Sequence, residues 1–144
     1  MITSCGCIIV HENKILICRP RWDSEEWNIP KGKMNDDETS YLATAIRETK
    51  EECNIDINVN KRIETIGLVP YLKKKNLYLF LVEIKTIPEI KCNSFYKSNE
   101  GFKPEMIDYK WIDIDEYDKY LGRGLKNVFD LIKEHVINFI EKEI

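Results

Sequence analysis

Three glutamates at helical spacing constrain this chain more than any other feature of its sequence. Glu48 stands three residues before Glu51 and four before Glu52, so the three carboxylates fall near one face of a helix. On a bare helix each like-charge pair at this spacing costs about 0.2–0.5 kcal/mol. A divalent cation among them would remove that cost, and carboxylate and carbonyl oxygens are the ligands that Mg²⁺ and Mn²⁺ prefer. The segment that starts at Gly32 therefore predicts a loop and a helix that hold a metal ion.

The same segment resembles the Nudix box of the Nudix hydrolases. That family pattern is Gly, five residues, Glu, seven residues, Arg-Glu, an apolar residue, any residue, Glu-Glu, any residue, Gly and an apolar residue. Three positions depart from it: eight residues, 39–46, precede Arg47, Thr49 takes the apolar place, and Asn54 replaces the closing Gly. The last change is mild, because Asn also adopts the left-handed conformation at helix ends. The matching residues are Gly32, Glu38, Arg47, Glu48, Glu51, Glu52 and Ile55.

The resemblance implies a role for each matching polar residue. Glu48 and Glu52 would be the main ligands of a Mg²⁺ or Mn²⁺ cofactor, and the Gly32 carbonyl would complete the shell. Glu51 would be a further or water-mediated ligand, and it counts with Glu52 among the predicted catalytic residues. The remaining pair, Arg47 and Glu38, would orient the helix rather than touch substrate. A solvated acidic helix face is the alternative for the glutamates alone.

A general base for attack by water is expected in the loop before a late strand. Glu105 stands six residues before Trp111, which is similar to the Glu–five residues–Trp pattern of the family's dinucleoside tetraphosphate hydrolases. We therefore predict Glu105 as the base or an extra metal ligand, with Glu100 as the second choice. The alternative is that Glu105 is an ordinary exposed loop carboxylate.

Substrate contacts are predicted from residue type and position. Lys31 and Lys33 flank the metal loop and are predicted to bind phosphate, although a solvated surface role is the alternative for any single lysine. Tyr71 follows a strand beside three lysines and is predicted as a stacking surface for a nucleobase. Trp27 is expected to pack in the core. Weaker candidates are Arg19, Arg21, Lys73, Lys74, Lys75 and Lys103 for phosphate, and Trp22, Tyr78, Phe95 and Tyr96 for the base.

The loop Pro30-Lys31-Gly32 resembles that of dinucleoside polyphosphate hydrolases, diphosphoinositol polyphosphate hydrolases and the mRNA-decapping branch of the family. The decapping enzymes usually carry a further helical domain, and a diphosphoinositol substrate would need a denser basic cluster. The predicted function is therefore a metal-dependent pyrophosphohydrolase acting on a dinucleoside polyphosphate such as diadenosine tetraphosphate. ADP-ribose, nucleotide sugars and nucleoside triphosphates remain open as substrates. A non-catalytic nucleotide sensor would usually lack box glutamates, and an isomerase would need catalytic residues that we do not find.

Composition bounds the partners of the chain. A net charge of −3 argues against a general nucleic-acid surface, so a small nucleotide is expected as the partner, with no nucleic acid. No apolar run is long enough to span a membrane. The five scattered cysteines are interpreted as reduced, mostly buried residues of a cytoplasmic protein. The oligomeric state is left open.

The pattern of apolar residues predicts one domain over residues 1–144. Strands, then a helix, then more strands and a closing helix indicate an α/β fold with a mixed sheet between helices. This agrees with the α/β/α sandwich that the Nudix resemblance implies. The expected strands are 4–10, 14–19, 55–59, 62–71, 76–85 and 109–114, the expected helices are 39–53, a short one ending near Gly122 and 125–140, and 86–104 is expected to be irregular.

Overall fold

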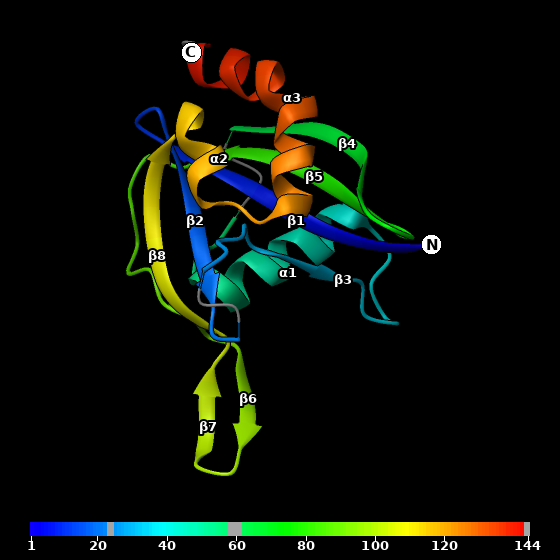
Figure 1. Ribbon diagram of the computed structural model, residues 1–144, viewed down its shortest axis with the longest axis vertical. Coiled ribbons are helices and arrows are strands. Elements are labelled where there is room, and N and C mark those ends of the chain that lie inside the picture. Colours follow the sequence, from blue (N-terminus) through cyan, green and yellow to red (C-terminus); the bar gives the residue numbers. More distant parts are fainter. Residues whose placement is uncertain (23–24, 58–61, 143–144) are drawn as a thin grey trace.

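The computed structural model describes residues 1–22, 25–57 and 62–142, and within these residues the centre is a mixed six-stranded sheet. The strands lie in the order β4-β5-β1-β2-β8, and β3 pairs with β1 (Figure 1). Only the β1–β5 pair is parallel among the described pairings of this sheet. The strands are β1 (Ile2–His11), β2 (Lys14–Pro20), β3 (Lys31–Lys33), β4 (Arg62–Leu72), β5 (Lys75–Glu83) and β8 (Met106–Asp113).

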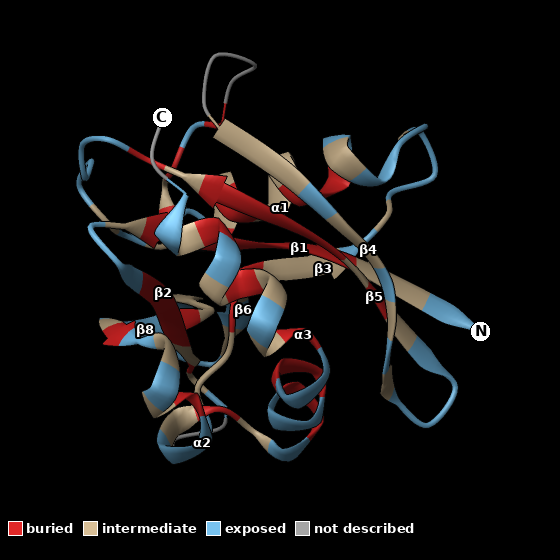
Figure 2. Ribbon diagram, turned by 90° about the horizontal axis from the view of Figure 1, so that it is seen from above, coloured by how far each residue is buried: buried red, intermediate tan, exposed pale blue. Residues whose placement is uncertain are grey.

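Helices cover both faces of this sheet. One core contains Ile8 and Val10 of β1 together with the buried side of α3 (Arg123–Glu141). The other contains Cys7 and Ile9 of β1 together with α1 (Tyr41–Cys53). Alternate residues of β1 therefore point to opposite helical layers, and residues 5–10 of the strand are all buried because both of its faces are covered (Figure 2). The predicted α/β/α sandwich with a mixed sheet is confirmed.

Shorter elements complete the domain. The turn η1 (Ile114–Glu116) and helix α2 (Tyr117–Tyr120) lead from β8 to α3. Among the described residues, β6 (Phe95–Ser98) and β7 (Gly101–Pro104) form a separate two-stranded hairpin that projects from the body (Figure 1). All five cysteines lie among the described residues and are free thiols, four of them buried. No helix within the described ranges is both long and apolar enough to cross a membrane.

Two predicted elements are wrong. Residues 55–57 form no strand, although Ile55 and Ile57 are buried against the α1 layer; their apolar alternation reflects core packing rather than sheet pairing. The rest of that predicted strand, residues 58–59, lies outside the described residues. The segment 86–104, expected to be irregular, contains the β6–β7 hairpin. Its turn uses Gly101, whose φ of +105° suits glycine and few other residues.

Candidate active site

Strand β3 brings the glycine loop against helix α1. Gly32 pairs with Cys5 of β1, and Lys31 pairs with Gly6. A Cβ on Gly6 would lie 2.5 Å from the Pro30 carbonyl oxygen, and one on Gly32 would lie 2.1–2.4 Å from the carboxyl atoms of Glu48. Both glycines are therefore needed for close approach, the first of β3 to β1 and the second of the Glu48 carboxylate to the loop.

Two of the three departures from the family pattern fall at the ends of α1, where the helix accommodates them. Ser40 caps the helix, and its side chain accepts a hydrogen bond of 3.0 Å from the Ala43 N–H, so the extra residue lies before the first turn. Asn54 ends the helix in the left-handed region with φ 62° and ψ 31°, as predicted for a residue in the place of glycine. At the third departure, Thr49 is buried and its hydroxyl donates to the Ala45 carbonyl at 2.8 Å, so the polar group is satisfied within the helix.

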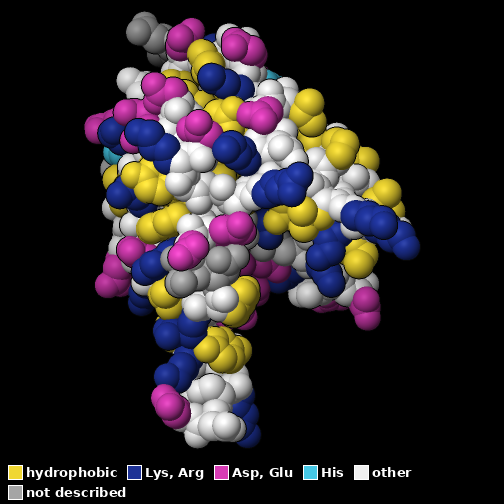
Figure 3. All heavy atoms as spheres, in the orientation of Figure 1, with side chains coloured by type: hydrophobic (Ala, Val, Ile, Leu, Met, Phe, Trp, Pro, Cys, Tyr) yellow, Lys and Arg dark blue, Asp and Glu magenta, His cyan; other side chains and the backbone are white. Residues whose placement is uncertain are grey.

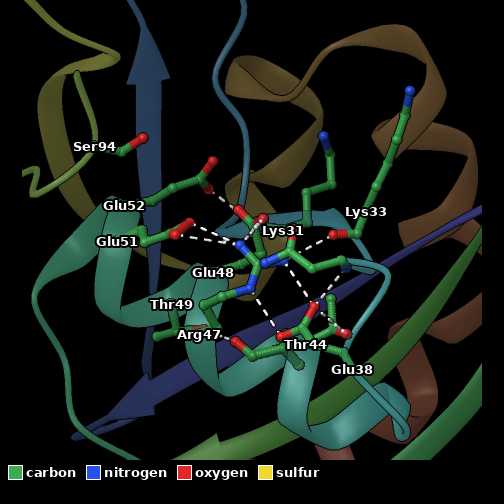
Figure 4. A network of polar contacts seen from close by, with 12 residues as sticks. Lys31, Lys33, Glu38, Thr44, Arg47, Glu48, Thr49, Glu51, Glu52 and Ser94 are labelled. Atoms are coloured by element: carbon green, nitrogen blue, oxygen red, sulfur yellow. Dashed lines mark hydrogen bonds and ion pairs between the residues drawn. The ribbon is translucent and has the colours of Figure 1, made fainter. Parts of the chain in front are cut away.

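Arg47 connects the loop to the glutamates of α1 (Figure 4). Its Nε and Nη2 donate to the two carboxylate oxygens of Glu38 at 2.8 and 3.0 Å, and Nη2 also donates to the Lys33 carbonyl at 2.8 Å. Its Nη1 donates to Glu48 and to Glu51, each at 2.8 Å. The hydrogen bonds that Arg47 donates to Glu38 hold the pKa of the Glu38 carboxyl at about 2. The extra residue before the helix therefore does not separate Glu38 from Arg47, and both lie where an orienting role requires them.

Glu48 and Glu52 are carboxylates that the fold removes from water. Glu52 is only 7% exposed, and its Oε1 accepts a hydrogen bond of 3.0 Å from the Lys31 N–H. Burial, with a smaller contribution from the charges of neighbouring glutamates, raises the pKa of Glu52 to about 8 and that of Glu48 to about 7. Buried acids with raised pKa values in a common cluster are typical of a functional site.

Glu105 lies beside this buried pair. Its negative charge is one of the causes that raise the pKa of both Glu48 and Glu52. The Ser94 hydroxyl donates to Glu105 Oε1 at 2.7 Å, and the Glu105 N–H donates to the Ser94 carbonyl at 2.9 Å. The second choice, Glu100, stands in the β6–β7 turn, where it is exposed and pairs with Lys103 at 2.9 Å. The structure therefore brings Glu105, and not Glu100, to the glutamates of α1.

The chemistry of these donors fits a hard divalent cation. Within the described ranges, no three Asp, Glu, His or Cys side chains surround one point closely enough to hold a metal ion. The Arg47 Nη1 lies between Glu48 and Glu51 and donates to both. Glu51 is 37% exposed and has room to turn away from the guanidinium. A cation bound by Glu48 and Glu52 would favour their charged forms and so lower their pKa values.

The predicted substrate contacts fall on one side of the loop. Lys31 Nζ lies 5.4 Å from the centre of the Tyr71 ring, and both Lys31 and Lys33 extend away from the glutamates (Figure 4). Tyr71 packs against Gly124, where a Cβ would lie 2.7 Å from the ring. Tyr71 also lines a cavity of about 220 Å³ together with Trp22, Trp27 and the start of α3. Trp27 is partly buried against the core, as predicted, but it contributes to this cavity too.

Sequence reasoning missed two features of the site. Ser94 was not a candidate, because only the pairing of its segment with Glu105 reveals its role. The small residues Gly122 and Gly124, which open the cavity at the start of α3, also carry no signal of their own in the sequence.

The family model for the NUDIX domain matches residues 2–132 of the 144-residue chain. The chain belongs to the Nudix family. It is therefore a Nudix hydrolase, and enzymes of this family generally need a divalent metal such as Mg²⁺ or Mn²⁺.

Relatives of this Nudix hydrolase carry different substrate names. An asymmetrical bis(5′-nucleosyl)-tetraphosphatase of Sus scrofa is 28% identical over 129 residues, which cover 80% of this chain and 81% of the relative. An RNA pyrophosphohydrolase of Pelagibacter ubique is 28% identical over 142 residues, covering 91% and 88%. The crystal structure of a diadenosine tetraphosphate hydrolase from C. elegans matches with a TM-score of 0.70 at 18% identity, covering 94% of this chain and 99% of that one. The last match shows the fold.

Proposed function

We propose that this Nudix hydrolase cleaves a pyrophosphate bond of a dinucleoside polyphosphate, with diadenosine tetraphosphate as the expected substrate. The proposal rests on one observation above others. The loop at Gly32, the buried Glu52 with the partly buried Glu48, and the carboxylate of Glu105 that Ser94 holds meet at one place. An aromatic cavity with Lys31 at its side adjoins the same loop.

The residues for the metal are those of the loop and α1. Glu48 and Glu52 would hold Mg²⁺ or Mn²⁺ with the Gly32 carbonyl, and Glu51 would join them after leaving its contacts with Arg47. The cation would supply charge neutralisation for the pyrophosphate and activation of water. Arg47 would remain bound to Glu38, because two hydrogen bonds fix its guanidinium there, and so would keep α1 in register with the loop.

Glu105 is the proposed general base. Its Oε1 accepts the hydrogen bond from Ser94, which fixes the carboxylate and leaves Oε2 to take a proton from the attacking water. A base placed in this way contributes typically 10²–10⁴-fold to rate. The proposed phosphate contacts are Lys31 and Lys33, since a long polyphosphate needs more neutralisation than a diphosphate. Tyr71 in its cavity would stack one nucleobase.

Replacing Glu105 with Gln should lower kcat by roughly a hundredfold with little change in KM, because the amide cannot accept the proton. The measurement is steady-state kinetics on diadenosine tetraphosphate with saturating Mg²⁺. The same kinetics on Glu100→Gln locate the base. A larger loss in that variant would move the role to the hairpin turn, and two unchanged variants would place the base elsewhere.

A panel of substrates tests the proposed function directly. We expect diadenosine tetraphosphate to be cleaved to ATP and AMP faster than ADP-ribose, a nucleotide sugar, a nucleoside triphosphate or an RNA with a 5′-triphosphate. Reaction in heavy-oxygen water would show which phosphorus the water attacks. If ADP-ribose or the RNA is preferred about tenfold, the substrate assignment is wrong while the pyrophosphohydrolase activity stands. Tight binding of the whole panel without turnover would instead indicate a nucleotide sensor.

A further inference from the structure

The β6–β7 hairpin exposes aromatic side chains next to the proposed site. It stands out from the body as an arm (Figures 1 and 3), and its Phe95 and Phe102 are 54% and 74% exposed. A two-stranded hairpin has no core of its own, so its side chains remain available for contact with a ligand. The two strands run directly out of Ser94 and into Glu105, so the arm is an extension of the active site.

The pairing register assigns the side chains of the arm to two faces. Tyr96 pairs with Lys103, and the contact between Ser94 and Glu105 continues this pairing at the base of the arm. Because alternate residues of a strand share a face, Ser94, Tyr96, Lys103 and Glu105 lie on one side, which we call the Glu105 face. The burial pattern agrees, since Tyr96 and Lys103 are half-buried and Phe102 on the other face is exposed.

Trp22 joins the Glu105 face to the cavity at Tyr71. Its ring meets the Tyr96 ring edge-on, with centres 6.2 Å apart and planes at 71°, and it is also part of the cavity wall. Trp22 is 67% exposed, so most of its ring is open to a ligand. An aromatic surface therefore continues from the cavity proposed for one nucleobase to the hairpin face that carries the proposed base.

We propose that Tyr96 of the Glu105 face and the adjoining Trp22 hold the second nucleoside of a dinucleoside polyphosphate. The inference rests on the proposed function and adds the residues that select a substrate with two nucleosides. Two observations favour this occupant: the face adjoins the proposed base, and aromatic side chains such as Tyr96 and Trp22 can stack any base. Phe95 and Phe102 point away from this path and are not part of the site.

The test compares two substrates that differ only in the second nucleoside, diadenosine tetraphosphate and adenosine 5′-tetraphosphate. For Tyr96→Ala we expect kcat/KM to fall about tenfold on the first and by less than about twofold on the second, because only the first loses a stacked base. Tyr96→Phe should retain the preference of the wild type, since the ring remains. Phe102→Ala is the matched control on the opposite face and should leave both values within about twofold of wild type.

The possible outcomes separate this inference from the proposed function. A wild type that prefers diadenosine tetraphosphate, with the preference intact in Tyr96→Ala, overturns the role of the hairpin alone. Equal losses on both substrates also overturn it, because they indicate a displaced Glu105 rather than a lost nucleoside contact. A wild type that hydrolyses other pyrophosphates but shows no preference for the second nucleoside overturns both the substrate assignment and the inference.

Discussion

Replacing Glu52 with Gln is expected to reduce kcat on any pyrophosphate substrate by at least about a hundredfold while the protein stays folded. Gln has nearly the same shape and can keep the hydrogen bond from the Lys31 N–H, but it cannot offer a charged ligand to a cation. The measurement is phosphate release over a range of Mg²⁺ concentrations, with circular dichroism to show that the fold persists. Glu134→Gln on the exposed side of α3 is the matched control. Near-normal turnover in Glu52→Gln with Mg²⁺ would show that the assigned site is wrong.

The same substitution should change how stability depends on pH in the metal-free protein. Burial raises the pKa of Glu52 to about 8, whereas an unfolded chain has a glutamate pKa of about 4.3. The contribution of this carboxyl to stability is therefore fully present below about pH 4.3 and is lost as the pH rises through about 8. Wild type in a chelator should lose more stability than Glu52→Gln as the pH rises from about 4.3 to about 8, the range between the unfolded and folded pKa values. Urea unfolding measures this; an identical loss in the two proteins would contradict the assignment of a buried, proton-holding Glu52.

The glutamate cluster on α1 could be predicted because its geometry is local. The positions of Glu48, Glu51 and Glu52 follow from helical periodicity alone, and the glycine loop before them follows from a family pattern with fixed spacing. The extra residue before Arg47 did not change this, since Ser40, two residues after Glu38, caps the helix and the Arg47–Glu38 contact is kept. The sequence was enough to predict those parts of the site whose geometry is determined by residues close together in the chain.

The surroundings of the cluster depend on contacts between distant segments, which no spacing in the sequence specifies. The Asn93 N–H donates to the Glu51 carbonyl at 2.6 Å, and the Asn93 side chain donates to Asn54 at 2.9 Å. These bonds fasten the segment before β6 to the end of α1, and Ser94 then fixes Glu105. Glu105 was predicted from its spacing to Trp111. The contact of Ser94 with Glu105 and the course of the hairpin could be recognised only in the folded structure. For the same reason the cavity at Tyr71, which needs Gly124 of α3, could not be foreseen.

Gly32→Ala and Gly6→Ala should separate catalysis from stability. In Gly32→Ala the new Cβ would overlap the Glu48 carboxyl, the end of a flexible side chain, at 2.1–2.4 Å. Glu48 can turn aside, so we expect the fold to persist while kcat falls roughly a hundredfold, as for the loss of an electrostatic catalytic group. In Gly6→Ala the Cβ would instead lie 2.5 Å from the Pro30 carbonyl oxygen, and backbone cannot turn aside.

Gly6→Ala is therefore expected to be the less stable of the two variants, by about 1–3 kcal/mol relative to wild type, because β3 must move away from β1. Urea unfolding and steady-state kinetics on both proteins make the comparison. Equal stability losses in the two variants would mean that Gly32 serves loop packing rather than the placement of Glu48. Unchanged turnover in a folded Gly32→Ala protein would mean that Glu48 is not needed at the loop. Gly6 pairs with Lys31 and Gly32 with Cys5, so the two glycines lie one register position apart on paired strands. Opposite outcomes would therefore place the boundary between the scaffold and the site within this one strand pairing.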